Sequence, residues 1–263
     1  MEALKPLIEI QNLGTLFDHT WVHKNLNLTI YPHRIISIIG DSGSGKTTLI
    51  REILMLQPVT EGDIFLNGEN ISKLYYDDKK RKAIAAHIGM MFQQGALFSA
   101  LTVLENVIFP LKEYTHFSKK TLIELARIKL HMVGLTEDAF NKYPSQLSGG
   151  MLKRTALART LALDPEVIFL DEPTAGLDPQ SAYDMDQLIL NLKNDLKLTV
   201  IMITHDLDTI YAIVDEVVYI GGKKVLVHDS VEKASRITEF SGLANFFRGA
   251  RSTGRHRLTG ESR

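Results

Sequence analysis

The sequence predicts an α/β fold with a mostly parallel sheet that is covered by helices on both faces. Strand-like and helix-like segments alternate along the back half of the chain, which is the pattern of parallel strands joined by helical crossovers. A nearly all-apolar, β-branched run at Ile35–Gly40 is typical of a strand buried on both faces. The middle of the chain, from about Asp77 to Leu163, is helical in pattern.

The front end of the chain is rich in strand signals. Short apolar runs bounded by turn residues predict strands at Leu7–Asn12, Leu26–Tyr31 and Ile64–Asn67. The buried strand Ile35–Gly40 leads through a glycine-rich segment into a predicted helix at Thr47–Leu54. A sheet at the front of the domain and a strand–loop–helix unit therefore precede the helical middle.

Helical spacing is clear at Lys119–Val133, where Gly134 is a plausible C-cap. The back half then alternates strictly between the two kinds of element. The predicted order is a strand at Val167–Leu170, a helix at Pro179–Leu196, a strand at Thr199–Thr204, a helix at Asp206–Val214, and a hairpin of Val217–Ile220 with Lys223–Val227.

Composition narrows the class of protein. The chain has 263 residues, a formal net charge of -1 and no cysteine, so disulfides and thiolate metal sites are excluded. Near-neutral charge gives no reason to expect a polyanion partner such as nucleic acid. The N-terminus lacks the pattern of a signal peptide, and no stretch approaches the roughly 20 apolar residues of a membrane helix. We expect a protein that is soluble by itself and reaches a membrane only through a partner.

The glycine-rich segment Gly40-Asp-Ser-Gly-Ser-Gly-Lys-Thr47 matches the phosphate-binding P-loop pattern. Glycines let the backbone curl so that successive N–H groups point at an anion, and the start of the following helix adds partial positive charge. We expect Lys46 to reach the β- and γ-phosphates and Thr47 to ligate Mg²⁺. A surface turn with an incidental lysine is the alternative, but strand and helix flank the loop correctly. The candidate nucleotide-binding residues here are Gly40, Asp41, Ser42, Gly43, Ser44, Gly45, Lys46, Thr47 and Thr48.

Two carboxylates follow the apolar strand at 167–170. In a P-loop protein the first acid at such a strand end holds Mg²⁺ through water, which gives this role to Asp171. Glu172 is the candidate general base that orients or deprotonates the attacking water. Taken alone, the pair could be an acidic turn that caps a helix. Together with the P-loop it predicts a hydrolase.

A Leu-Ser-Gly-Gly motif at 147–150 leads into a helical segment. Ser148 as an N-cap with Gly149 and Gly150 forms a second bare anion site at a helix start. On these residues, with the P-loop and the carboxylates in the same order, the sequence resembles the ABC-transporter ATPase family. The family's usual next residue is Gln where this chain has Met151, a change that leaves the serine and the glycine amides intact.

The resemblance carries roles to further positions. Phe17 stands where the family places an aromatic ring that stacks on adenine; Trp21 competes for the role, and a core phenylalanine at a strand end is the alternative. Gln93 resembles the glutamine that contacts Mg²⁺ and the attacking water. Asp178 closes an Ala-Gly-Leu-Asp segment that resembles the loop touching the opposite subunit. His205 resembles the switch histidine that contacts the γ-phosphate, although a lone histidine at a strand end is usually structural.

The resemblance implies a fold with a RecA-like P-loop core and an N-terminal antiparallel β subdomain. A helical subdomain, at about 94–160, is inserted and carries the signature motif. We expect residues 4–248 to form one domain. Residues 249–263, rich in arginine, are expected to form a basic, flexible tail.

The family also implies that one chain is half an enzyme. Two copies pack head to tail and close two composite ATP sites, each joining Lys46 of one copy to Ser148 of the other, with ATP and Mg²⁺ as the ligands. Hydrolysis removes the charge that holds the dimer and so drives a rigid-body motion.

The stretch from Gln93 to Glu113, with Gly-Gly-Met at the signature, is similar to the Mla-type ATPases. These serve lipid transport between the membranes of Gram-negative bacteria. The resemblance implies a permease of the MlaE kind, a periplasmic MCE-domain protein, a small STAS-domain partner, and a position on the cytoplasmic face of the inner membrane. An apolar groove around Leu97 and Phe98 suits docking of a permease helix; core packing between the lobes is the alternative.

Other functions stay open from the sequence. An ABC ATPase for a small solute such as an amino acid shares every core motif. A soluble ABC protein acting on nucleic acid or ribosomes typically carries two ATPase domains or a long coiled coil, and neither is visible here. A P-loop kinase or small GTPase fits poorly, because it needs neither Leu-Ser-Gly-Gly nor the second carboxylate at Glu172.

Overall fold

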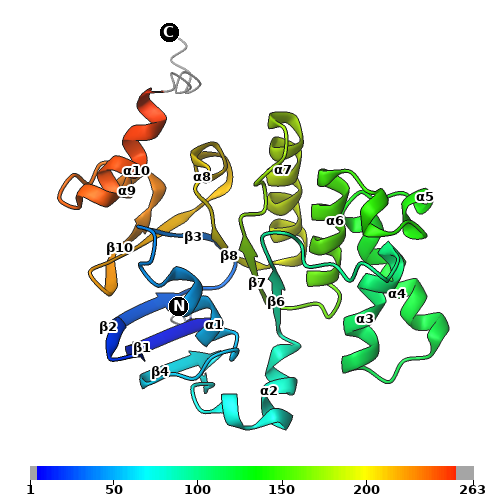
Figure 1. Ribbon diagram of the computed structural model, residues 1–263, viewed down its shortest axis with the longest axis horizontal. Helices are drawn as coiled ribbons and strands as arrows, with labels where there is room; N and C mark the ends of the chain where they lie inside the picture. The colour runs from blue at the N-terminus through cyan, green and yellow to red at the C-terminus, as the bar shows by residue number, and fades with distance from the viewer. Residues whose placement is uncertain (1–4, 253–263) are drawn as a thin grey trace.

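The computed structural model describes residues 5–252, which form a sheet-rich part on the left of Figure 1 and a helical lobe on the right. The larger sheet has six strands in the order β10-β9-β3-β8-β7-β6. All neighbours pair in parallel except β10 with β9. The strands are β3 (Ile35–Gly40), β6 (Ile88–Met91), β7 (Val167–Asp171), β8 (Thr199–Ile203), β9 (Glu216–Gly221) and β10 (Lys224–Ser230). The predicted α/β class with a mostly parallel sheet is confirmed.

A second, antiparallel sheet forms the front of the domain. Its order is β2-β1-β4-β5, with β1 (Ile8–Phe17), β2 (Thr20–Ile30), β4 (Glu61–Leu66) and β5 (Glu69–Asn70). Alternate apolar residues of β1, β2 and β4 pack on helix α1 (Lys46–Ile53) and on one face of the parallel sheet in a shared core. This core fixes the antiparallel sheet against the helix that follows the glycine-rich loop.

The helical lobe lies between β6 and β7 in the sequence, as expected for an inserted subdomain. It contains α3 (Val103–Tyr114), α4 (Lys119–Met132), α5 (Glu137–Phe140) and α6 (Gly149–Thr160), after the separate short helix α2 (Asp78–Ala85). Apolar residues of α3, α4 and α6 join those on the other face of the parallel sheet in one core. Thr102 closes a full capping box with Glu105 at the start of α3, which sets where this lobe begins its first long helix.

The remaining helices are α7 (Pro179–Leu196), α8 (Leu207–Ile213), α9 (Val231–Ala234) and α10 (Ser241–Ser252). Helix α10 was not predicted; its Leu243 and Phe247 are buried against β9 and β10. This helix continues beyond residue 249, where the flexible tail was expected to begin; the rest of that tail lies outside the described residues. Within residues 5–252, no helix is long and apolar enough to cross a membrane.

One buried carboxylate makes the stability of this fold depend on pH. Asp186 on α7 is 4% exposed, and both its oxygens lie within 3.1 Å of the Thr209 hydroxyl, which donates to them. Burial, with smaller contributions from Asp206 and Asp208, raises the pKa of Asp186 from 3.8 to about 6. The folded state therefore holds a proton that the unfolded state releases, so the contribution of Asp186 is greatest below pH 4 and is lost as pH rises to about 6.

We therefore expect Asp186→Asn to stabilise the protein at pH 7.5, by up to about 3 kcal/mol, because the amide keeps an acceptor for Thr209 without the buried charge. The gain should shrink as pH falls from 6 to 4. Chemical denaturation at several pH values measures it. Asp184→Asn, on the exposed face of the same helix, is the matched control; an Asp186→Asn gain that does not change with pH contradicts the account.

Candidate functional site

The glycine-rich loop connects the end of β3 to the start of α1. Gly45 is the N-cap residue of α1, in the left-handed region with φ of 98°, which favours glycine. Gly40, at the other end of the loop, touches the neighbouring strand: a Cβ built on it lies 2.4 Å from the backbone oxygen of Ile220. A side chain at either end would displace the loop. The sequence thus folds into an open cradle at a helix start, where backbone N–H groups can bind an anion.

Lys46 occupies the cradle itself. Its Nζ donates to the backbone oxygens of Gly40, at 2.7 Å, and Asp41, at 3.0 Å. Burial lowers the pKa of Lys46, while the charges of Asp41 and Glu172 act in the opposite direction. The Ser44 hydroxyl is buried beside it with no hydrogen-bond partner. A phosphate group supplies what both side chains lack, an anion for the ammonium and an acceptor for the hydroxyl, so the residues present fit a nucleotide's phosphates.

The two carboxylates follow the carboxyl end of β7. Asp171 is the last residue of that strand, and Glu172 has left-handed backbone with φ of 48°, an uncommon geometry for glutamate that is found at functional sites. The amide of Glu172 is fixed by donation to the oxygen of Ile203 at 2.9 Å. Burial raises the pKa of both carboxyls. His205 Nε2 lies 3.8 Å from Glu172 Oε1, so the structure brings these predicted site residues together.

Lys153 was not singled out from the sequence, yet it connects three parts of the site. It lies on α6, is 8% exposed, and its Nζ donates to the backbone oxygens of Gln93, at 2.5 Å, and Glu172, at 2.8 Å. Burial lowers the pKa of Lys153 and the two carboxylates, Glu172 and Asp171, raise it. No local signal distinguishes Lys153, because the buried positions of α6 also include polar residues, Thr155 and Thr160.

Gln93 and the aromatic candidates lie at the edges of the site. Gln93 follows β6 and has an exposed side chain, while its backbone is held by Lys153. Phe17 ends β1 and is 44% exposed. Trp21 is half-buried and covers its own sheet, since a Cβ built on Gly14 lies 2.9 Å from the indole ring. Phe17 therefore has the freer face for a planar ligand.

The signature residues lie away from the phosphate loop. Ser148 is the exposed N-cap of α6 and accepts from the Met151 amide at 3.3 Å; Gly149 and Gly150 form the first turn. Figure 1 shows α6 in the helical lobe on the right and α1 next to the antiparallel sheet on the left, so Ser148 and Lys46 belong to different lobes. Asp178 caps α7 by accepting from the Ser181 amide at 3.0 Å, and these bonds lower its pKa.

Helix α10 covers one side of the phosphate loop, which no motif indicated. A Cβ built on Gly242 lies 2.2 Å from the Tyr219 hydroxyl and 2.8 Å from a carboxylate oxygen of Asp41. The Phe246 ring lies 6.5 Å from that of His205. These residues line a cavity of about 300 Å³ together with the first residues of the loop. Helix α10 and the phosphate loop are far apart in the sequence, so no local sequence pattern could have predicted their contact.

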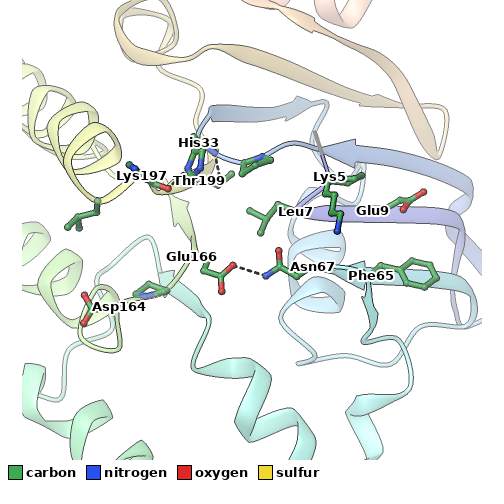
Figure 2. Close-up of a pocket in the computed structure, with 15 residues that line it drawn as sticks. Lys5, Leu7, Glu9, His33, Phe65, Asn67, Asp164, Glu166, Lys197 and Thr199 are labelled. Carbon is green, nitrogen blue, oxygen red and sulfur yellow. Dashed lines mark hydrogen bonds between the residues drawn. The ribbon is translucent and has the colours of Figure 1, made fainter. Parts of the chain in front are cut away.

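A larger cavity, of about 690 Å³, lies at the opposite end of the parallel strands. Figure 2 shows Asn67 and Glu166 facing one another across it, joined by a 2.7 Å hydrogen bond. Its other walls include His33, which precedes β3, and Thr199, the first residue of β8. None of the predicted site residues lines this cavity. The phosphate loop and the carboxylates instead follow the carboxyl ends of the strands, where ligands bind in open α/β sheets.

Comparison with known proteins agrees with this geometry. The ABC transporter family model matches residues 23–175. The intermembrane phospholipid transport system ATP-binding protein MlaF of Haemophilus influenzae is 37% identical over 227 residues, which cover 86% of this chain and 85% of that protein. The methionine import ATP-binding protein MetN of Staphylococcus haemolyticus is 40% identical over 207 residues, or 79% of this chain and 60% of that protein.

Solved structures give the same result. A dimeric ATP-binding cassette in a post-hydrolysis state with ADP and Pi superposes with a TM-score of 0.76 at 32% identity, over 85% of this chain and 98% of that one. The cbiO1 protein of Clostridium perfringens, part of an ABC transporter complex, gives 0.80 at 26% identity over 95% and 96%. The motifs, the two-lobed fold and these matches agree, and the chain belongs to the ABC transporter family as an ATP-binding, ATP-hydrolysing subunit.

Proposed function

We propose that two copies of this chain form the dimeric ATPase that drives a transporter, with each ATP bound between the phosphate loop of one copy and the signature helix of the other. The observation that carries the proposal is the separation of Ser148 from Lys46 in two lobes of one chain. Ser148, Gly149 and Gly150 form a largely exposed helix start, and the amides of such a first turn can bind an anion. A second copy in head-to-tail arrangement supplies the triphosphate.

Within each composite site, the loop amides and Lys46 hold the phosphates, and Phe17 stacks on the base. The oxygens of Thr47, Asp171 and Gln93 fit a Mg²⁺ ion, since Mg²⁺ is usually bound by one or two protein oxygens together with phosphates and water. When bound, the ion neutralises charge that develops on the phosphates. Asp178 lies at the start of α7, where it would meet the second copy.

Glu172 is the residue that we assign to the attacking water. Its left-handed backbone and the Lys153 bond to its carbonyl oxygen fix where the carboxylate points. Burial raises its pKa, which brings the group closer to the neutral range in which a general base works best. His205, 3.8 Å away, is placed to contact the γ-phosphate and to hold the carboxylate in orientation.

Glu172→Gln should nearly abolish ATP hydrolysis, because the amide keeps the shape of the side chain but cannot accept the proton. The variant should still bind MgATP and should accumulate as a dimer, since the charge that holds the two copies together is not removed. Phosphate release and size-exclusion chromatography with MgATP measure the two effects. Glu166→Gln, at the other end of β7, is the matched control. Undiminished turnover in Glu172→Gln would remove this residue from the role.

We further propose that the transported cargo is lipid, specifically phospholipid moved between the two membranes of a Gram-negative cell. The MlaF relatives are matched over 85% of their length, whereas the methionine importer of Staphylococcus haemolyticus is matched over 60% of its own. The proposal includes a permease of the MlaE kind, MCE-domain and STAS-domain partners, and a place on the cytoplasmic face of the inner membrane. A small-solute importer is the second candidate, because methionine and sulfate importer subunits are also similar.

The surface for the permease is an apolar groove between β6 and α3. Phe92, Phe98 and Phe109 line it and are 43%, 44% and 40% exposed. The Phe98 and Phe109 rings pack with centroids 4.6 Å apart. Asn106 fixes the loop that carries Phe98, since its amide donates to the oxygens of Phe98, Leu101 and Thr102. A preformed apolar groove next to Gln93 suits an amphipathic helix of a membrane partner, and links that helix to the ATP site.

Phe109→Asp should abolish co-purification with a permease while ATP binding by the isolated protein is retained, because a charge in the groove opposes burial of an apolar helix. Affinity purification from detergent-solubilised membranes, with identification of partners and bound lipid, measures this. Phe117→Asp is the control, since Phe117 is 52% exposed but lies outside the groove. Co-purification of an amino-acid permease without MCE-domain protein or phospholipid would support the second candidate and contradict lipid transport.

A further inference from the structure

A fully buried polar cluster lies directly behind the phosphate loop. It consists of His23 on β2, Thr15 on β1 and Glu52 on α1, which are 0%, 1% and 2% exposed. The cluster therefore joins both strands of the antiparallel sheet's first hairpin to the helix that the loop begins. Its surroundings are apolar core, in which polar side chains are rarely found unless they are paired.

The donor and acceptor of each hydrogen bond in the cluster can be assigned. Thr15 Oγ1 donates to Glu52 Oε1 at 2.7 Å, because a carboxylate can only accept. The same hydroxyl then accepts from His23 Nδ1 at 2.9 Å. Glu52 Oε2 lies 3.5 Å from that nitrogen. His23 is thus held by its Nδ1 on one side, and its Nε2, on the other side of the ring, is buried without a hydrogen-bond partner.

That free nitrogen touches the loop. A Cβ built on Gly45 lies 2.3 Å from His23 Nε2, 3.0 Å from His23 Cδ2 and 2.8 Å from Val22 Cγ1. Gly45 is also the left-handed residue that turns the loop into α1. The imidazole is therefore packed against the one glycine whose backbone sets the direction of the first amides of the helix.

Stability alone does not account for this arrangement. Apolar side chains would fill the same space without the cost of desolvating charged or polar groups. Here two polar atoms, His23 Nε2 and Glu52 Oε2, are buried without a hydrogen bond, and unpaired buried polar atoms are costly. Unpaired buried groups in a native structure call for an explanation beyond packing, and the phosphate loop is the site in contact with His23 Nε2.

We propose that His23 is a positioning residue of the phosphate loop. Held by Thr15 and Glu52, its ring fixes Gly45 so that the loop amides face the phosphates of ATP before the nucleotide arrives. His23 itself does not touch the nucleotide. The inference rests on the proposed role of residues 40–47 as the phosphate site and adds to it the group that sets the loop's geometry. It also ties the sheet that carries Phe17 to the loop, so the base and phosphate halves of the site move together.

A set of variants of the full chain tests this. His23→Leu leaves the buried Glu52 with Thr15 as its one remaining partner and should lower both thermal stability and affinity for ATP. The triple variant Thr15→Val/His23→Leu/Glu52→Leu removes the whole buried cluster and leaves none of its polar atoms unpaired, so its thermal stability should recover. Its affinity for ATP should stay about tenfold below wild type, because displacement of binding groups by a fraction of an ångström to an ångström is costly. The KM for ATP should rise by the same factor with kcat nearly unchanged.

His228→Leu is the matched control, because His228 makes a similar 3.0 Å contact with a glutamate, Glu216, at the start of β9, away from the loop. It should leave ATP affinity unchanged. Thr15→Val, which deletes only the bridging hydroxyl, is the milder variant should the others not fold, and should also weaken ATP binding.

Wild-type affinity in the stable triple variant, or in folded Thr15→Val, would overturn the inference while leaving the proposed function intact. Wild-type protein that binds no ATP, or binds it as tightly after Lys46→Ala, would instead overturn the proposed function and this inference with it.

Discussion

The attraction between a triphosphate and the loop at residues 40–47 is the interaction on which the rest of the structure depends. A buried strand, β3, brings the chain to the carboxyl edge of the sheet, and α1 begins there with its amides unpaired. Lys46 spans the loop and donates to the loop's own carbonyl oxygens, those of Gly40 and Asp41. The site is thus built with its charge and its geometry in place, which limits the reorganisation that binding requires.

Around that loop, the fold divides the remaining tasks between two lobes. The parallel sheet carries Asp171, Glu172 and His205 on neighbouring strand ends, β7 and β8. The helical lobe carries the signature serine and borders the groove that we propose for a membrane partner. Lys153 lies where the lobes meet, and its bonds to the carbonyls of Gln93 and Glu172 give the helical lobe a direct contact with the hydrolytic carboxylate. Through Lys153, a movement of the helical lobe would shift the backbone of Glu172, the residue that we assign to the attacking water.

Features encoded by short segments were predictable from the sequence. The strand Ile35–Gly40 has the bounds that its apolar pattern predicts, and the phosphate loop follows from its glycines and its flanking elements. Strand β2 begins at Thr20, well before the predicted Leu26, because the polar residues of its first half are paired with β1 in a hairpin and need no apolar pattern. Tertiary pairing overrides local propensity in such strands.

Features made by distant segments were not predictable. The contact of Gly242 with Asp41 brings together residues about two hundred positions apart in the sequence. Lys153 and His23 acquire their roles only when helix α6 and strand β2 are placed against the carboxylates and the loop. Each looks like an ordinary polar residue in the sequence, since its partners are contributed by other elements. Assignment of Ser148 to a nucleotide rested on resemblance to a family, because one chain places it away from its own phosphate loop.

The central claim is that a complete ATP site contains Lys46 from one copy and Ser148 from another. Mixing two inactive variants, Lys46→Ala and Ser148→Arg, tests it most directly. In a mixed dimer, the loop of the Ser148→Arg copy meets the intact signature of the Lys46→Ala copy, so one whole site is regained. The account predicts that each variant alone hydrolyses almost no ATP and that co-expressed, co-purified mixed dimers recover a clear part of the wild-type rate. Mixed dimers as inactive as the separate variants would contradict it, and so would full activity of Ser148→Arg by itself.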